Sequence, residues 1–559
     1  MRRVNYILFG AIAALATVFV SCGEKDTPDP PPGPTPKNPV FIDAAIGSSS
    51  IGDGVYNISI QPVITVDFSE PLKQSTLATS ISVTDASGVQ VPVTATLTNS
   101  DKTVVVQPTA SLAYLKKYFV KAATTLQSAS GGSLQTAVSK AFITKMDSSR
   151  KFATISDNAL LDLVQQQTFK YFWDFGHPIS GLARERNSSG DVVTSGGSGF
   201  GIMAIPVGIN RGFITRAQGL ARMQTIVSFL KNTAVKVKGA FSHWLNGSTG
   251  AIVPFSANDN GADLVETSYL MMGLLTARQY FNGADAAETN LRTDINTLYN
   301  NVEWDWFRNG GQNVLYWHYS SNLGWIMNMP VRGWNECLIT YVLAASSTTH
   351  GVPASVYHSG WATGSGFING NTYYGFNLPL GPAQGGPLFF SHYSFMGINP
   401  NGLSDTYANY ATQTTNHSQI NYRYCIANPR SWYGYSDSCW GLTASDIPSG
   451  YTASSPTNDV SVIAPTAALS SMPYTPVESM KALKFFYYVL GDKLWKEYGF
   501  VDAFSLRDLW FAGSFLAIDQ GPIIVMIENH RTGLLWNLFT SCPEVKAGML
   551  SLSFSAPYL

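Results

Sequence analysis

The spacing of hydrophobic and polar positions changes along the chain and predicts two kinds of structure. Between residues 39 and 146, short β-branched runs alternate with turn residues, as in Val63-Ile64-Thr65-Val66 and Thr103-Val104-Val105-Val106. Runs of this length and spacing are typical of a small antiparallel sandwich. We therefore expect an all-β domain over 39–146. It carries no group of chemically active side chains, so we interpret it as a spacer or docking module, with accessory carbohydrate binding as an alternative.

From residue 151 to residue 559 the apolar positions follow a helical period, as in Leu160, Leu161, Val164 and Phe169. Further helices are expected near 215–235, 262–281, 287–303, 330–346, 405–426, 476–490 and 521–537. Long loops, such as 241–260 and 360–386, separate them, and loops of this length are usually functional. About ten to twelve helices with such loops favour a helical toroid. An irregular α+β domain stays open, because periodicity does not separate the two.

The N-terminal residues are expected to be a targeting signal rather than part of the fold. Arg2 and Arg3 precede an apolar stretch over 7–20, and Ser21-Cys22 follows at once. This arrangement resembles a bacterial lipoprotein signal over residues 1–22, with Cys22 as the lipidated residue. An ordinary secretory signal with an incidental cysteine is the alternative. We therefore expect an exported protein that a lipid anchors to the bacterial outer membrane. It would face either the periplasm or the cell surface.

A proline-rich linker over 23–38 follows the signal. Its prolines favour an extended polyproline form that would keep the domains away from the membrane.

Composition narrows the class of ligand. Charged residues make up 13% of the chain, about half the usual share. The net charge is −1, which gives no electrostatic basis for binding nucleic acid and no reason to expect more than a monomer. Aromatic residues also make up 13%, which suits a neutral ring-shaped ligand such as a sugar. A large core could equally account for these aromatics.

Four cysteines remain after the signal, namely Cys337, Cys425, Cys439 and Cys542. None forms a Cys-x-x-Cys pair, so we expect no zinc site. Export permits a local disulfide between Cys425 and Cys439, and free buried thiols are the alternative.

Four carboxylates stand out because they lie at the starts of apolar helical runs. Asp263 and Glu266 are one turn apart, Glu336 precedes the run 337–343, and Asp519 precedes 523–527. Glycoside hydrolysis needs one carboxylic acid and a second carboxylate, which makes these residues candidates. Asp-x-x-Glu before an apolar run is also a capping pattern, which the residues alone favour. Glu336 could likewise be a satisfied polar group near a helix end.

Several blocks occur in order from about residue 155 to residue 545. They are 161–165, 168–173, 181–186, 195–201, 243–247, 263–268, 333–336, 518–522 and 528–529. Together they resemble the glucoamylase-like domain family that holds glycoside hydrolase family 144. In the preceding domain, residues 66–72 resemble the opening of bacterial Ig-like modules.

The resemblance implies an (α/α)6 toroid over 151–559 that hydrolyses glucan in a central cleft without a metal or organic cofactor. The implied substrate is β-1,2-glucan or its oligosaccharides, cut internally or from an end with release of sophorose. A non-catalytic glycan-binding lipoprotein that has kept this fold is the alternative function.

The resemblance also implies functional roles for the four carboxylates. We expect Glu336 as general acid and Asp519 as base, acting directly or through water or a substrate hydroxyl, with inversion of configuration. Asp263 and Glu266 would then hold sugar hydroxyls. The exchange of roles, with Glu266 as acid or base, stays open.

Other side chains of these blocks and of the loops are candidates for binding sugar. They are Arg184, Glu185, His243, Trp244, Trp325, Trp334, Tyr393 and Glu528. Arg184 and Glu185 could instead form a salt bridge, and the aromatic side chains at 325, 334 and 393 could belong to the core.

The run Gly196-Gly197-Ser198-Gly199 invites two further interpretations, and both fail. It lacks the Lys-Ser/Thr ending of a phosphate loop. Phe200 stands where a Gly-x-Ser-x-Gly nucleophile motif needs its second glycine, which excludes Ser198 as a nucleophile of that type.

Overall fold

The computed structural model describes residues 35–52 and 54–559. The expected lipoprotein signal, Cys22 and most of the linker lie outside the described residues. The chain divides into two compact units, one ending at Met146 and one comprising Asp147–Leu559. Within the described ranges, no helix combines the length and the apolar character needed to cross a bilayer.

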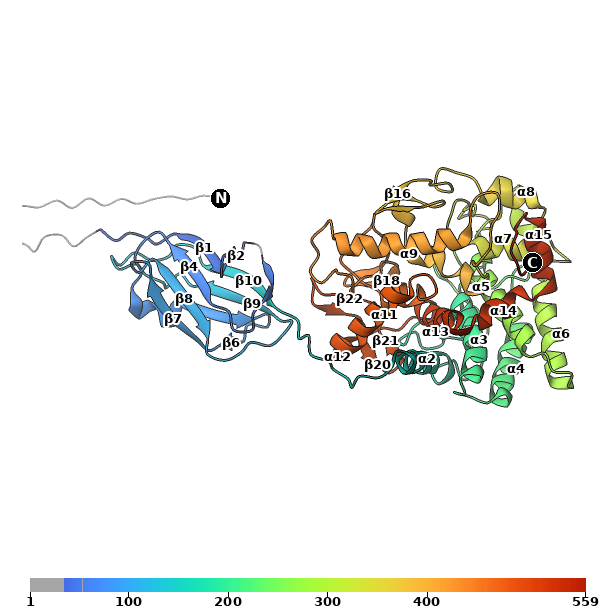
Figure 1. The fold of residues 1–559 in the computed structure, drawn as a ribbon, viewed down its shortest axis with the longest axis horizontal. Coiled ribbons are helices and arrows are strands. Elements are labelled where there is room, and N and C mark those ends of the chain that lie inside the picture. The colour runs from blue at the N-terminus through green and yellow to red at the C-terminus, as the bar shows by residue number, and fades with distance from the viewer. Residues whose placement is uncertain (1–34, 53) are drawn as a thin grey trace, which may run out of the picture. The chain divides into compact units, whose positions relative to one another are not determined.

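The first unit consists of two five-stranded sheets (Figure 1, blue). One sheet has the order β2-β1-β4-β8-β7 and the other β3-β10-β9-β5-β6. The strands are β1 Phe41–Ile46, β2 Ser49–Ser50, β3 Val55–Ile58, β4 Ile64–Phe68, β5 Ile81–Asp85, β6 Gln90–Val91, β7 Val93–Thr98, β8 Thr103–Pro108, β9 Lys117–Ala122 and β10 Val138–Thr144. Neighbouring strands are antiparallel, except that β10 pairs with β3 in parallel.

Alternating burial explains why these sequences form strands. In β4, Ile64, Val66 and Phe68 are buried while the residues between them are not. Such period-two burial fits a sheet with one face on a core. Val83 and Val120 of the other sheet belong to the same core cluster. The prediction of an all-β domain here is confirmed.

The second unit is helical (Figure 1). Its longer helices are α2 Asp157–Trp173, α3 Ser195–Asn210, α4 Arg216–Asn232, α5 Leu264–Tyr280, α6 Ala286–Asn300, α7 Leu338–Ser346, α9 Tyr410–Ala427, α11 Pro476–Lys484, α13 Ala517–Thr532, α14 Leu534–Thr540 and α15 Pro543–Ser551, with the shorter α10 Pro465–Ser470 and α12 Gly491–Leu494. Short strands connect them, among them β11 Val192–Thr194, β12 Trp244–Asn246, β13 Ile252–Val253, β14 Ala262–Asp263, β15 His318–Tyr319, β18 Ala444–Ile447, β19 Gly450–Ala453, β20 Trp495–Lys496, β21 Gly499–Phe500, β22 Phe504–Ser505 and β23 Trp510–Phe511.

Helices α3, α5, α7 and α13 pack on one another and form the centre of this unit. The glycine-rich run that the sequence left unassigned is the start of α3. A Cβ on Gly199 would lie 2.2 Å from the carbonyl oxygen of Tyr269, and one on Gly273 would lie 2.2 Å from the carbonyl oxygen of Gly199. The glycines therefore allow the backbones of α3 and α5 to touch.

Several predicted helices have different bounds from those expected, and two of them differ most clearly. The helix expected over 330–346 begins only at Leu338, because Gly333 adopts a φ of +83° in the preceding loop. The helix expected over 521–537 is interrupted at Gly533, whose φ of +69° ends α13 before α14 begins.

Cys337, Cys425, Cys439 and Cys542 are all free and buried.

Candidate active site

Asp263 and Glu266 share the start of α5 but do different things. Asp263 Oδ1 accepts hydrogen bonds from the amides of Val265 at 3.0 Å and Glu266 at 2.9 Å, so it caps the helix. Glu266 does not reach back, because the Asp263 amide donates to the carbonyl of Phe241. Its Oε2 instead accepts from the amide of Gly196, at 2.9 Å. The capping interpretation therefore holds for Asp263 and is wrong for Glu266.

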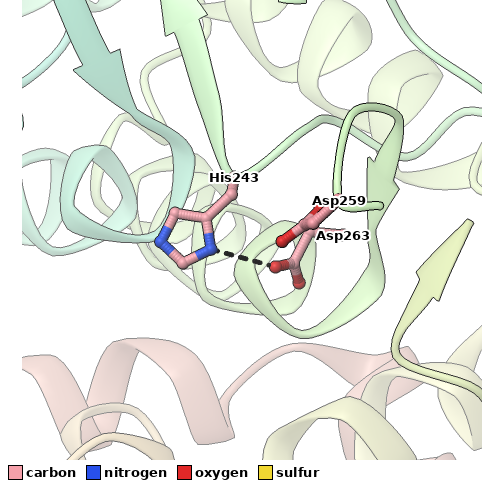
Figure 2. Close-up of side chains that lie close together, drawn as sticks. All are labelled: His243, Asp259 and Asp263. Atoms are coloured by element: carbon pink, nitrogen blue, oxygen red, sulfur yellow. Dashed lines mark hydrogen bonds and ion pairs between the residues drawn. The ribbon is translucent and has the colours of Figure 1, made fainter. Parts of the chain in front are cut away.

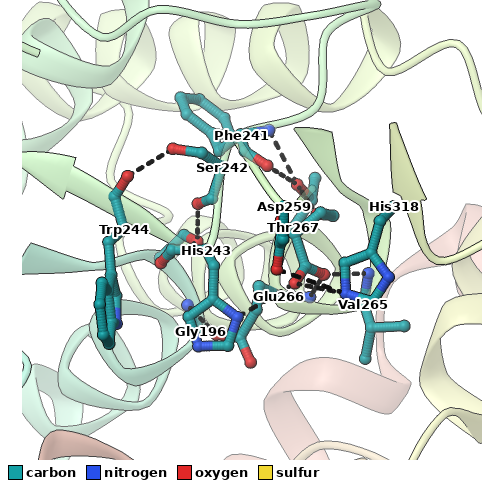
Figure 3. A network of polar contacts seen from close by, with 12 residues as sticks. Gly196, Phe241, Ser242, His243, Trp244, Asp259, Val265, Glu266, Thr267 and His318 are labelled. Atoms are coloured by element: carbon teal, nitrogen blue, oxygen red, sulfur yellow. Dashed lines mark hydrogen bonds and ion pairs between the residues drawn. The ribbon is translucent and has the colours of Figure 1, made fainter. Parts of the chain in front are cut away.

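His243 belongs to the same polar network, in which Gly196, Glu266 and His318 also take part (Figure 3). Its Nδ1 lies 3.1 Å from Asp263 Oδ2, and His318 Nε2 lies 3.7 Å from the same oxygen. Burial lowers the pKa of His243, but Glu266, Asp263 and Asp259 together raise it to about 9. His243 is thus an imidazolium at neutral pH, and the pKa of Asp263 is lowered because its bonds to histidine outweigh its burial.

His243, Asp259 and Asp263 are also close enough to surround an ion (Figure 2). Their ligand atoms lie within 4.8 Å of one another, and nitrogen and oxygen ligands suit several divalent metals. A metal would have to displace the proton of His243, because an imidazolium offers no lone pair at Nδ1. Asp263 Oδ1 is already committed to the helix cap. The proton on His243 thus balances the carboxylate charge of Asp263, as a metal ion would otherwise do.

Glu336 lies in the loop just before α7 and remains partly accessible. Ser394 fixes its backbone, because the Ser394 hydroxyl donates to the Glu336 carbonyl. Desolvation, together with the nearby Glu266 and Asp263 carboxylates, raises the pKa of the Glu336 carboxyl to about 7. Burial and Asp263 likewise raise the pKa of Glu266 to about 7. Both carboxyls can therefore hold a proton near neutral pH.

Tyr393 is a buried side chain that feels the charge of Glu336, Glu266 and Asp519. It is buried and packs on Phe200 and Tyr269. Burial raises its pKa well above the usual value, and the charges of Asp519, Glu336 and Glu266 raise it further. All three carboxylates therefore lie within electrostatic range of this one phenol. Segments far apart in the sequence thus bring their acids together.

Asp519 lies in the first turn of α13 and is 2% exposed. Burial raises its pKa well above the usual value, and Asp502 and Asp446 add to this effect. The positive charge of Arg186 opposes this rise in the pKa of Asp519. Glu185, one of the expected sugar ligands, binds Arg186 at 2.9 Å and so belongs to the surroundings of Asp519.

Two of the expected sugar ligands have structural roles instead. The Arg184 guanidinium donates to the carbonyls of Gly190 and Phe175, each at 2.9 Å. Glu528 is fully buried, and its carboxylate accepts from Arg211 and Gln165 at the far end of α13 from Asp519. The expectation that Glu528 binds sugar is wrong, because its oxygens are saturated by protein donors.

Of the aromatic side chains expected to bind sugar, one belongs to the core and two remain partly accessible. Trp334 is 3% exposed and packs on Trp361 and Tyr410, so its assignment to sugar stacking is wrong and it belongs to the core. Trp325 remains partly accessible in a cluster with Trp306, their ring centroids 4.7 Å apart. Trp244 remains partly accessible beside His243.

The sequence did not point to Asp259, His318, Asp446 and Asp502. A signal was available for Asp502, which stands alone within the apolar run Phe500-Val501-Asp502-Ala503-Phe504 of a charge-poor chain. A lone carboxylate in such a run must be satisfied in the interior or serve a function. The other three carry no comparable local signal.

Comparison with known proteins gives matches in both units. Residues 328–543 match the family described as "Putative glucoamylase", and residues 43–144 match "Bacterial Ig-like domain". An exo β-1,2-glucooligosaccharide sophorohydrolase of Parabacteroides distasonis is 47% identical over 439 residues, which cover 74% of this chain and 61% of that protein. The chain thus spans less than two thirds of that relative.

Solved structures resemble the fold as well. An endo-β-1,2-glucanase of Chitinophaga pinensis, solved in complex with sophorotriose and glucose, is 51% identical to this chain and superposes with a TM-score of 0.71. The match covers 73% of this chain and 100% of the glucanase chain. A β-1,2-glucanase of Parabacteroides distasonis is 38% identical with a TM-score of 0.70 and covers 92% of this chain and 73% of its own.

Proposed function

This chain belongs to the glucoamylase-like family that holds glycoside hydrolase family 144, and we propose that it hydrolyses β-1,2-glucan or its oligosaccharides. The relatives named above act on β-1,2-linked glucans. The observation that carries the proposal is that Glu336, Glu266 and Asp519, from distant segments, all lie within electrostatic range of the buried Tyr393. Glycosidic cleavage requires such a set, in which one carboxyl keeps its proton and another accepts one.

Glu336 is the general acid of this proposal. Its pKa of about 7 lets it hold a proton in the neutral range and give it to the leaving glycosidic oxygen. Its position in the loop before α7 leaves it partly accessible, as a group that touches substrate must be. Glu266 has a similar pKa, so an exchange of roles between the two is the alternative assignment.

Asp519 is the proposed base, which takes a proton from water, directly or through a substrate hydroxyl. Attack by that water on the anomeric carbon would invert its configuration. His243, oriented by its bond to Asp263 and partly accessible, then offers its other ring nitrogen to a sugar hydroxyl, with Trp244 beside it. Analysis of the first-formed anomer by NMR tests the inversion.

The helices of the second unit form an (α/α)6 toroid in this proposal, with the four carboxylates at one end of its central helices. The protein is exported, lipid-anchored through Cys22 to the outer membrane and monomeric. Loss of membrane association in Cys22→Ala cells and a monomeric mass in size-exclusion chromatography are the expected results.

A panel of linear glucans that differ only in linkage tests the function. Release of reducing sugar from the β-1,2-linked polymer and not from β-1,3- or β-1,4-linked polymers is the expected result. Short products from the start of the reaction would indicate cleavage from an end, and long ones internal cleavage. Binding of β-1,2-glucan without release of sugar would instead identify a non-catalytic glycan-binding protein.

A further inference from the structure

Asp502 lies beside the proposed base, in a position that the mechanism above does not use. It is held between β21 and β22, while Asp519 belongs to α13. Each residue is 2% exposed, and their carboxyl groups lie within hydrogen-bonding reach of each other. Two acidic side chains from distant segments thus meet in the interior.

Protein donors do not satisfy this pair. Asp502 Oδ2 accepts from the amide of Asp446 at 2.7 Å. Asp502 Oδ1 and Asp519 Oδ2, both buried, have no hydrogen-bond donor among the described residues. Ionised carboxylates are acceptors only, so two of them can bond to each other only if one carries a proton. Like charges in contact also cannot both be ionised at modest cost.

The surrounding charges favour retention of that proton. Asp446 contacts Asp502 through its amide and accepts from Arg186 Nη1 at 3.2 Å. Arg186 is also bound by Glu185, so one guanidinium faces two other carboxylates. Tyr393 and Tyr451 are the other titratable side chains that feel the charge of the pair. The nearby groups other than the pair therefore carry a net charge of about −1 at neutral pH.

We propose that Asp502 and Asp519 share one proton, with Asp502 as the positioning residue that takes up this shared proton when Asp519 accepts a second one. The inference rests on the proposed role of Asp519 as base. The attacking water would give its proton to Asp519, and Glu336 would give its own to the leaving oxygen. The pair would then hold two protons and release one to solvent, while Glu336 takes one up, which restores the starting state.

Infrared spectroscopy tests the shared proton without reference to activity. At about pH 8.5, well above the pKa of about 7 of Glu336 and Glu266, the wild type should keep a protonated-carboxyl band. Asp502→Asn and Asp519→Asn should each lose it, because the new amide donates to the remaining carboxylate and removes the like charge in contact with it. Asp508→Asn, which changes a surface aspartate paired with Arg507, is the matched control and should keep the band.

Kinetics on β-1,2-gluco-oligosaccharides test the positioning role. Asp502→Asn keeps a neutral donor to Asp519, so its kcat/KM should stay within about tenfold of the wild type. Asp502→Ala removes the donor, so the acid limb of its kcat/KM profile should move up by about one pH unit or more. KM should change little in both, because Asp502 is buried.

Two results would overturn the proposal. One is the absence of the infrared band from the wild type or its persistence in Asp502→Asn. The other is an equal loss of kcat in the Asn and Ala variants without a shift of the acid limb, which indicates a merely structural role. If the band behaves as expected but no glucan is hydrolysed, the shared proton stands and the proposed function fails.

Discussion

The amide of Gly196 donates to Oε2 of Glu266 at 2.9 Å and so joins the first turn of α3 to the first turn of α5. A Cβ at position 196 would lie 2.2 Å from that same oxygen. Only glycine lets the backbone approach the carboxylate this closely. The glycine-rich run thus positions an acid and neither binds phosphate nor provides a nucleophile.

Gly196→Ala should therefore displace the Glu266 carboxylate. We expect a loss of unfolding free energy of about 1–3 kcal/mol from overpacking and a fall in kcat/KM of about tenfold or more. Denaturant unfolding and reducing-sugar release measure the two effects. Gly513→Ala is the matched control, because a Cβ there meets no atom within 4 Å. Wild-type kinetics in Gly196→Ala would show that Glu266 needs no such placement.

Glu336→Gln should abolish turnover while it leaves oligosaccharide binding measurable. The amide cannot protonate the leaving oxygen, and general acids contribute about 10²- to 10⁴-fold to the rate. Reducing-sugar assays and calorimetric titration with a β-1,2-gluco-oligosaccharide check the two parts. Glu303→Gln, at a surface glutamate paired with Lys238, should behave as the wild type. Near-normal turnover in Glu336→Gln would remove Glu336 from the mechanism.

His243 should make the second unit less stable as the pH rises. Its folded-state pKa of about 9 lies above the usual value of about 6.5, so the imidazolium contribution is complete below pH 6.5 and is lost as the pH passes through 9. The free energy of unfolding should therefore fall between these values, and less steeply in His243→Gln. His350→Gln alters a more exposed histidine and should keep the wild-type slope. Equal slopes in all three proteins would contradict the raised pKa.

Removal of residues 38–146 should leave hydrolysis of soluble substrate largely intact. The β-sandwich has its own core and forms a compact unit apart from Asp147–Leu559. The Chitinophaga pinensis glucanase, which matches 73% of this chain over its full length, supports a self-sufficient catalytic unit. Initial rates of the truncated and full proteins give the comparison, with circular dichroism as the folding control. A collapse of activity in a folded truncated protein would mean that the sandwich shapes the site.

Part of the candidate site follows from local sequence. Asp263, Glu266, Glu336 and Asp519 stood out because a charge-poor chain places few carboxylates at the starts of apolar helices. Trp334 and Glu528 were expected to bind sugar, yet both are interior residues. Apolar sequence neighbours surround a core residue and a residue beside a binding site alike. The local pattern could therefore not decide between a core position and a sugar-binding one.

The sequence by itself determined the division into two units, the type of secondary structure in each and which carboxylates are candidates for catalysis. It could do so because alternating burial, helical period and an isolated charge are local properties. Only the tertiary structure decided that Glu266 bonds to Gly196, that His243 pairs with Asp263 and that Asp502 meets Asp519. These contacts join residues between 17 and 70 positions apart, and the pKa values of the acids depend on them. Proton affinity in an interior is set by neighbours in space, which no local spacing encodes.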